Sequence, residues 1–126
     1  MTFPYFCTTL NIKVMYATIS ADIVSFTSLS KTEMIELSQH IEKQLKMLEA
    51  LYPRLWGRLI KGDYIECVFP NASDAFRIAL IIKTSIKAFQ VKKTVEKKAF
   101  YTYGVRIAIG IGDMRIVDRE KGIIDG

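Results

Sequence analysis

The chain has 126 residues, of which 50% are apolar and 25% charged, a composition that favours a single folded domain over disorder. It contains no run of about 18 apolar residues, so no segment is expected to span a membrane. The formal net charge is +5, and the two cysteines, Cys7 and Cys67, have neither the spacing of a zinc site nor the pattern of a disulfide scaffold.

The N-terminal residues carry no sign of export. They are mildly apolar but lack the basic start and the small-residue cleavage site of a signal peptide. We therefore expect a cytoplasmic protein with reduced thiols. The excess positive charge gathers between Lys83 and Lys98, where a solvated helix end and loop is the favoured interpretation and a phosphate-rich partner the alternative. Aromatic residues do not alternate with these lysines as they do in single-strand binders, so a nucleic-acid partner is not expected.

A strand and a long helix are predicted first along the chain. Residues 14–21 are rich in β-branched and apolar side chains, as in a buried strand. Apolar residues then recur at helical spacing over residues 31–51. Ser30 and Glu33 have the spacing of a capping box at the start of this helix. Pro53 disfavours helix at the residue before it, so the helix should end near residue 51.

A hairpin and a second helix follow. Residues 55–60 and 64–69 have the composition of strands. The connection between them, Lys-Gly-Asp at residues 61–63, is typical of a hairpin turn. Residues 73–89 again place apolar side chains at helical spacing, which predicts the second helix.

The last part of the chain predicts shorter elements. Residues 90–100 are polar and lysine-rich, as in a connection, and residues 103–111 form a nearly apolar fourth strand. A short strand is predicted over residues 114–117 and a turn over residues 118–122. Residues 123–124 suit the start of another strand.

The order strand, helix, strand, strand, helix, strand is that of the ferredoxin-like, or palm, fold. We therefore predict an α+β domain over residues 1–126, with an antiparallel sheet and both helices on one face. In this topology the first strand and the hairpin lie side by side at the centre of the sheet. Because residues 123–126 resemble the middle of an element, we expect the domain to lack its C-terminal part.

Two acidic residues, Asp22 and Asp63, lie where apolar strand patterns stop. An acid at a strand end costs burial energy unless something pairs with it. The predicted topology brings both acids to one edge of the sheet, where two carboxylates would suit Mg²⁺ or Mn²⁺ and its phosphate ligands. The backbone N–H groups of residues 23–27 could cradle phosphate oxygens. A cap or turn role for Asp22 and turn chemistry for Asp63 are the alternatives.

The residues around these acids resemble motifs of the class III adenylate and guanylate cyclases. Residues 20–27, Ser-Ala-Asp-Ile-Val-Ser-Phe-Thr, resemble the first metal-binding motif of that family. Residues 61–63, with the strand up to Phe69, resemble its second metal motif. Residues 105–112, Val-Arg-Ile-Ala-Ile-Gly-Ile-Gly, are similar to its later strand. The match keeps the family's order over most of the chain.

The resemblance implies metal-dependent cyclisation of a nucleoside triphosphate to a 3′,5′-cyclic nucleotide, with the site at the interface of a homodimer. It implies that Asp22 and Asp63 hold Mg²⁺ or Mn²⁺, with the backbone carbonyl of Ile23 as a further ligand. The residues it places at the nucleotide are Val24, Ser25, Phe26, Thr27, Lys61 and Gly62.

The sequence departs from the family pattern at several places. Leu59 stands four residues before the second acid, where the family has a base-selecting lysine, and Gly110 replaces the usual histidine of the third motif. The family's later asparagine and arginine, which stabilise the transition state, are absent from this chain. We therefore expect little or no cyclase activity from it.

Other interpretations stay open beside a nucleotide-binding domain. A degenerate cyclase-like domain could sense a nucleotide or regulate a protein partner such as a transcription factor. A nucleic-acid-binding domain on the same fold would need exposed aromatic residues on the sheet face. For Arg106, a structural pair on one face of its strand is favoured over a phosphate-directed role. Trp56 is expected to pack in the core or at an edge, and Glu66 to lie on the surface.

Overall fold

The computed structural model describes residues 15–24, 26, 29–89, 104–114 and 116–125, with only the backbone of Ile116. The elements in chain order are β1 (Tyr16–Val24), α2 (Lys31–Leu51), β2 (Trp56–Ile60), β3 (Tyr64–Phe69), the 3₁₀ helix η2 (Ala72–Asp74), α3 (Ala75–Ala88), β4 (Gly104–Gly112), β5 (Ile116–Asp118) and β6 (Ile123–Asp125). The predicted order of strands and helices is confirmed. The connection predicted over residues 90–100 lies outside the described part of the chain.

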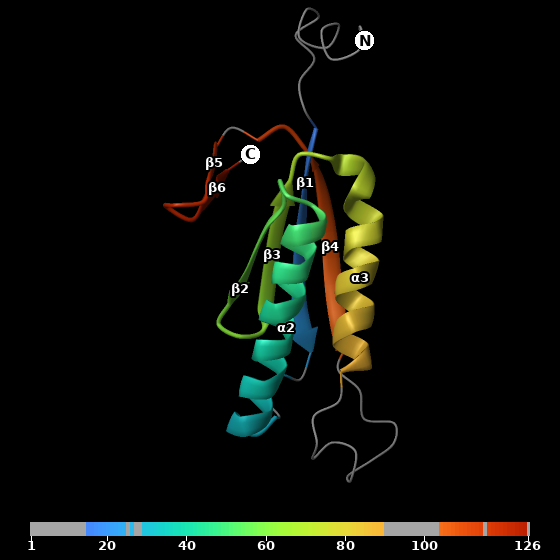
Figure 1. Ribbon diagram of the computed structural model, residues 1–126, viewed down its shortest axis with the longest axis vertical. Helices are drawn as coiled ribbons and strands as arrows, with labels where there is room; N and C mark the ends of the chain where they lie inside the picture. The colour runs from blue at the N-terminus through green and yellow to red at the C-terminus, as the bar shows by residue number, and fades with distance from the viewer. Residues whose placement is uncertain (1–14, 25, 27–28, 90–103, 115, 126) are drawn as a thin grey trace, which may run out of the picture.

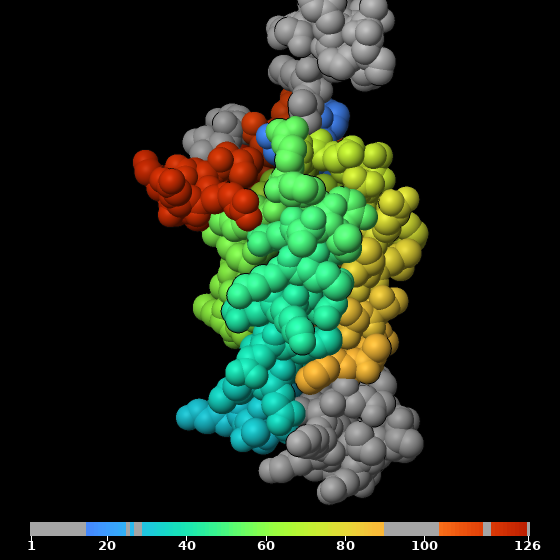
Figure 2. Space-filling model, in the orientation of Figure 1, coloured from blue at the N-terminus to red at the C-terminus, as the bar shows by residue number. Residues whose placement is uncertain are grey.

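Four strands form one sheet in the order β2-β3-β1-β4, and every neighbouring pair is antiparallel. Helices α2 and α3 both lie on one face of this sheet (Figure 1), and Figure 2 shows them covering that face side by side. The prediction of an α+β palm fold with both helices on one face is therefore confirmed. The strands β1 and β3 occupy the centre, so the end of β1 and the β2–β3 turn lie at the same end of the sheet.

The core lies between the helices and the sheet, because alternate residues of the strands and one stripe of each helix are buried there. In β1 the burial alternates strictly along the strand. Fully buried aliphatic side chains of this kind contribute roughly 1.5–3 kcal/mol each. The most deeply buried residues of the core include Ile19, Leu37, Ile41, Leu48, Ile65, Ile78 and Ile86.

The first strand extends beyond its predicted end at residue 21. It continues to Val24, because β4 pairs with it through Asp22, Ile23 and Val24. The correction has a simple physical cause: polar residues on the open face of β1 alternate with buried ones, so the strand does not end where its apolar run ends. Asp22 is consequently part of the strand.

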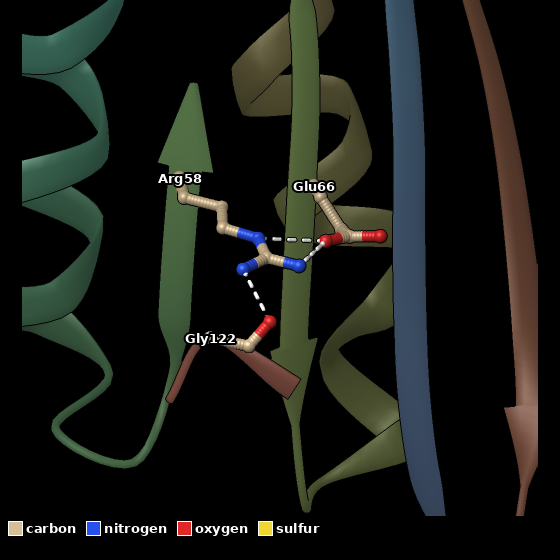
Figure 3. A network of polar contacts seen from close by, with 3 residues as sticks. All are labelled: Arg58, Glu66 and Gly122. Carbon is tan, nitrogen blue, oxygen red and sulfur yellow. Dashed lines mark hydrogen bonds and ion pairs between the residues drawn. The ribbon is translucent and has the colours of Figure 1, made fainter. Parts of the chain in front are cut away.

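Two arginines attach the β5–β6 hairpin to the rest of the domain: Arg58 connects it to the edge strand β2, and Arg119 connects it to α2. Arg58 donates from Nε to Glu66 Oε1 at 2.8 Å and from one terminal nitrogen to the carbonyl oxygen of Gly122 at 2.7 Å (Figure 3). Arg119 donates to Glu49 Oε2 at 2.9 Å. Glu66 was expected to be a plain surface residue. It instead forms an ion pair with Arg58.

Trp56 is half-buried on β2, as expected for packing at an edge. The guanidinium carbons of Arg58 and Arg119 lie 4.9 Å and 5.9 Å from the centre of its ring. Arginines in this position are attracted to the face of an indole. Among the described residues, no helix is long and apolar enough to cross a membrane.

Candidate functional site

The end of β1 and the β2–β3 turn are joined by a backbone hydrogen bond. The N–H of Ile23 donates to the carbonyl oxygen of Asp63 at 3.1 Å. Asp22 is paired with Tyr64, the first residue of β3, so the two acids lie at the same end of the sheet. This confirms the predicted proximity of the two segments, while a role for either carboxylate in metal binding stays a prediction.

The turn that carries Asp63 has an unusual backbone and an anchor on α2. Lys61 and Gly62 both have positive φ, of 55° and 81°. Ser38 of α2 donates from Oγ to the carbonyl oxygen of Gly62 at 3.2 Å. A left-handed conformation is readily adopted by glycine but costs energy for a residue with a side chain. The position of Asp63 is thus set by the turn conformation and by the helix beneath it.

The side chain of Asp22 lies on the open face of the sheet, opposite the helices. Arg106 of β4, its register partner, donates from Nε to Oδ1 at 2.9 Å and from a terminal nitrogen to Oδ2 at 2.6 Å. The pair is solvated, with exposed fractions of 35% for the Asp22 side chain and 75% for that of Arg106. The hydrogen bond from Arg106 is the main reason why the pKa of Asp22 lies below its usual value, and Asp22 raises the pKa of Arg106 in turn.

A shallow cavity lies around this ion pair on the open face. Its volume is about 230 Å³, and its lining includes Ser20, Tyr64 and Ala108 besides the pair itself. A second hollow of about 210 Å³ lies further along β1 and β4, between Thr18 and Gly110. Both hollows combine small residues with large side chains, among them Tyr64 in the first and Tyr16 in the second.

A larger cavity lies at the other end of the sheet. It has a volume of about 400 Å³ and is lined by residues 51–55, from the end of α2 to the start of β2, and by Phe69, Pro70, Asn71 and Asp74. It contains neither Asp22 nor Asp63. The volume of a cavity therefore does not identify the candidate site. The site is chosen for its two acidic residues and for the geometry of the turn.

The other residues predicted to contact a nucleotide differ in how exposed they are. Val24 is 39% exposed at the end of β1, and Lys61 is exposed on the turn. Phe26 is only 8% exposed and belongs to the core cluster. Its side chain is therefore not available to a phosphate, and only its backbone could serve one. Ser25 and Thr27 lie outside the described residues.

The donor chemistry at this end of the sheet suits a hard divalent cation. Carboxylates are the ligands that Mg²⁺ and Mn²⁺ prefer, and Mg²⁺ typically takes one or two of them with substrate phosphates completing the shell. Asp22, near the end of β1, and Asp63, in the neighbouring β2–β3 turn, are the candidate pair. No group of three or more His, Cys, Asp or Glu side chains suited to a metal occurs among the described residues. Oxygens from water or from a bound ligand would therefore complete the shell of a cation here.

The contact between Arg106 and Asp22 could not be predicted from the sequence. A structural pair was expected for it and is present, but its partner is the candidate metal ligand Asp22, 84 residues away. No local spacing connects the two positions. The motif around residues 105–112 indicates only that Arg106 lies on a strand, and the pairing of β1 with β4 decides what it faces.

No protein-family model and no curated protein matches the sequence. Solved structures of cyclase domains do match. The non-canonical dimeric guanylyl cyclase domain of the RhoGC fusion protein from the aquatic fungus Blastocladiella emersonii has a TM-score of 0.62 and 17% identity, over 85% of this chain and 63% of that one. The guanylate cyclase domain of RhGC from Catenaria anguillulae, in complex with GTP, has a TM-score of 0.62 and 18% identity, over 83% and 62%.

A bacterial structure gives a similar result. The adenylate/guanylate cyclase/hydrolase from Silicibacter pomeroyi has a TM-score of 0.61 and 22% identity, over 89% of this chain and 62% of that one. The chain thus spans about three fifths of the length of these solved domains. The match establishes that most of this chain has the fold of class III cyclase catalytic domains, which confirms the resemblance at the level of the fold.

Proposed function

We propose that this chain is a divergent class III cyclase-like domain that binds a nucleoside triphosphate together with Mg²⁺ or Mn²⁺. The observation that carries the proposal is the hydrogen bond from Ile23 N–H to the Asp63 carbonyl, which holds the two acidic segments together on a cyclase fold. The cyclase domain from Catenaria anguillulae was solved with GTP, which supports a nucleotide as the ligand.

Each candidate residue has a definite task in this proposal. Asp22 and Asp63 hold the cation, and the backbone carbonyl of Ile23 serves as a third protein ligand. When bound, the cation supplies positive charge that neutralises the triphosphate and polarises its oxygens. Lys61, exposed on the turn, adds charge for the phosphates, and the backbone that follows Val24 lies beside them.

Arg106 also belongs to the proposed site. An arginine guanidinium forms parallel hydrogen bonds equally well with a carboxylate or a phosphate. A cation on Asp22 would release the guanidinium for phosphate oxygens close to the cavity that it already lines. The role expected for Arg106 is therefore to orient the triphosphate.

Catalysis is proposed to be weak. In a cyclisation the ribose 3′ oxygen bonds to the α-phosphorus, its proton leaves, and the bond to the departing pyrophosphate breaks. Leu59, at the position of the family's base-selecting lysine, packs against the core. The base of the nucleotide is thus held less selectively than in an active cyclase. A homodimer is proposed as the binding form, in line with the dimeric domain from Blastocladiella emersonii.

Calorimetric titration of the chain with ATP and GTP, with and without Mn²⁺, tests this function. We expect metal-dependent binding that is reduced at least about tenfold by Asp22→Ala and by Asp63→Ala, since each removes a charged ligand. Asp74→Ala is the matched control, because Asp74 lies at the start of α3 and its side chain makes no capping hydrogen bond. Nucleotide binding that survives both site substitutions would contradict the proposal.

A regulatory module is the second candidate. The burial of Leu59 against the core and the engagement of Asp22 by Arg106 both favour a domain that has lost the chemistry and acts through a protein partner. Under this alternative the folded wild-type chain binds neither ATP nor GTP in the presence of Mn²⁺.

A further inference from the structure

We propose that Arg106 is a built-in counter-ion of the metal site: it occupies the Asp22 carboxylate when no cation is bound and competes with the cation for it. This inference rests on the proposed function, because it assumes that Asp22 is a metal ligand. It adds a regulation of that site, since the affinity for the metal is set partly by a residue of the chain itself.

The geometry sets Arg106 and a cation in competition for the Asp22 carboxylate. Arg106 uses both carboxylate oxygens at once, at 2.9 Å to Oδ1 and 2.6 Å to Oδ2. A divalent cation bound by Asp22 needs at least one of these oxygens at about 2.0–2.1 Å for Mg²⁺. The guanidinium charge would then face a second positive charge at close range, which is repulsive. A carboxylate oxygen has lone pairs for a hydrogen bond and a cation, so this repulsion is the force that moves Arg106 away as the cation binds.

The surroundings allow this exchange at a low cost. The pair lies on the solvated face of the sheet, and the Arg106 side chain is 75% exposed. Water and salt screen exposed ion pairs, so even a two-pronged arginine–carboxylate pair on this face costs far less to open than a buried one. The residues two before and two after Arg106 on the same face of β4 are Gly104 and Ala108, which leave room for the long side chain to swing away.

Titration of the intact chain with Mn²⁺ alone, with free ion measured by electron paramagnetic resonance, tests the competition. We expect Arg106→Gln to bind Mn²⁺ about two- to tenfold more tightly than the wild type, because an exposed ion pair and a nearby repulsive charge are both removed. Arg119→Gln is the matched control: it removes an equal charge from an exposed arginine–carboxylate pair between the β5–β6 hairpin and α2. It should leave Mn²⁺ affinity unchanged. Circular dichroism confirms that each variant is folded.

A second variant and a second measurement distinguish competition for Asp22 from a nonspecific effect of replacing Arg106. Arg106→Lys keeps the charge but loses the two-pronged contact, so its affinity for Mn²⁺ should lie between those of the wild type and Arg106→Gln. In the wild type, addition of Mg²⁺ should shift the Arg106 Nε–H resonance in a nitrogen-correlated NMR spectrum as the pair opens.

The outcomes separate this inference from the function on which it rests. The counter-ion role of Arg106 is supported if Arg106→Gln binds Mn²⁺ more tightly than the wild type while Arg119→Gln does not, and if the Nε–H resonance shifts in the wild type. Equal Mn²⁺ affinity in the wild type and Arg106→Gln, or Mg²⁺ binding without that shift, overturns the counter-ion and leaves the metal site standing. Absence of Mn²⁺ binding in both proteins overturns the metal site and the counter-ion together.

Discussion

At the scale of single residues, Gly62 determines the geometry of the β2–β3 turn most directly. Its φ is +81°, and a Cβ atom there would lie 3.0 Å from Ser38 Oγ and 3.4 Å from Phe26 Cζ. A side chain would thus meet both an unfavourable backbone conformation and close neighbours. Since Asp63 follows immediately, the candidate site depends on the absence of a side chain at this position.

We expect Gly62→Ala to lower the free energy of unfolding by about 1–3 kcal/mol, because alanine is strained at this φ. Urea denaturation monitored by circular dichroism measures the change. Gly112→Ala serves as the control, because a Cβ atom there meets nothing within 4 Å. Equal stability of the two variants would show that the turn tolerates a side chain.

At the scale of elements, α2 begins with a complete capping box. Glu33 N–H donates to Ser30 Oγ at 3.2 Å, and Ser30 N–H donates to Glu33 Oε1 at 2.8 Å. These bonds satisfy backbone donors that a helix start leaves without partners. The same helix carries Ser38, which anchors the β2–β3 turn. The start of α2 therefore supports the candidate site as well as the core.

Replacing the capping serine should cost stability. We expect Ser30→Ala to lower the free energy of unfolding by about 1 kcal/mol, since one backbone donor of the first turn loses its acceptor. Chemical denaturation followed at a helix wavelength gives the value. Ser73→Ala, which removes an exposed hydroxyl bonded only to Asn71 Oδ1 among the described contacts, should change it by less than about 0.5 kcal/mol. If Ser73→Ala lowered the free energy of unfolding as much as Ser30→Ala, loss of the cap would not be the cause.

At the scale of the whole molecule, the small β5–β6 sheet is separate from the main sheet and is attached to it by side chains. Arg58 contacts both Glu66 and the carbonyl of Gly122, and Glu49 accepts hydrogen bonds from both Arg119 and the backbone of Gly57. The bond from Gly57 also occupies one backbone N–H of the edge strand β2, a group that an edge strand otherwise offers to other chains.

Weakening the Arg58 contact should loosen the hairpin. We expect Arg58→Lys to increase the rate of amide hydrogen exchange in Ile123–Asp125 several-fold, because lysine cannot bind Glu66 and Gly122 with one planar fork. Mass spectrometry of exchanged peptides follows the change. Arg77→Lys, on the exposed side of α3, is the control. Unchanged exchange in the hairpin would mean that Arg119 holds it without help.

Much of the architecture was predictable, because it depends on local patterns. The bounds of α2 and β3 agree with those expected from helical spacing, the capping box and the hairpin signal. The end of β1 was predicted three residues before its actual position at Val24. The polar residues on the open face of this strand look, in the local sequence, like the residues that end a strand. The partners of Arg106 and Glu66 were not predictable, because they lie on other strands.

The sequence by itself determined the order of the elements and the buried stripe of each helix, because periodicity and turn chemistry act over a few residues. The topology that this order indicates also predicted that the end of β1 lies beside the β2–β3 turn. The tertiary structure alone decided that Asp22 faces Arg106, that Phe26 is buried, and that the hairpin rests on β2. These outcomes depend on strand register, in which a shift by one residue would turn every side chain to the opposite face of the sheet.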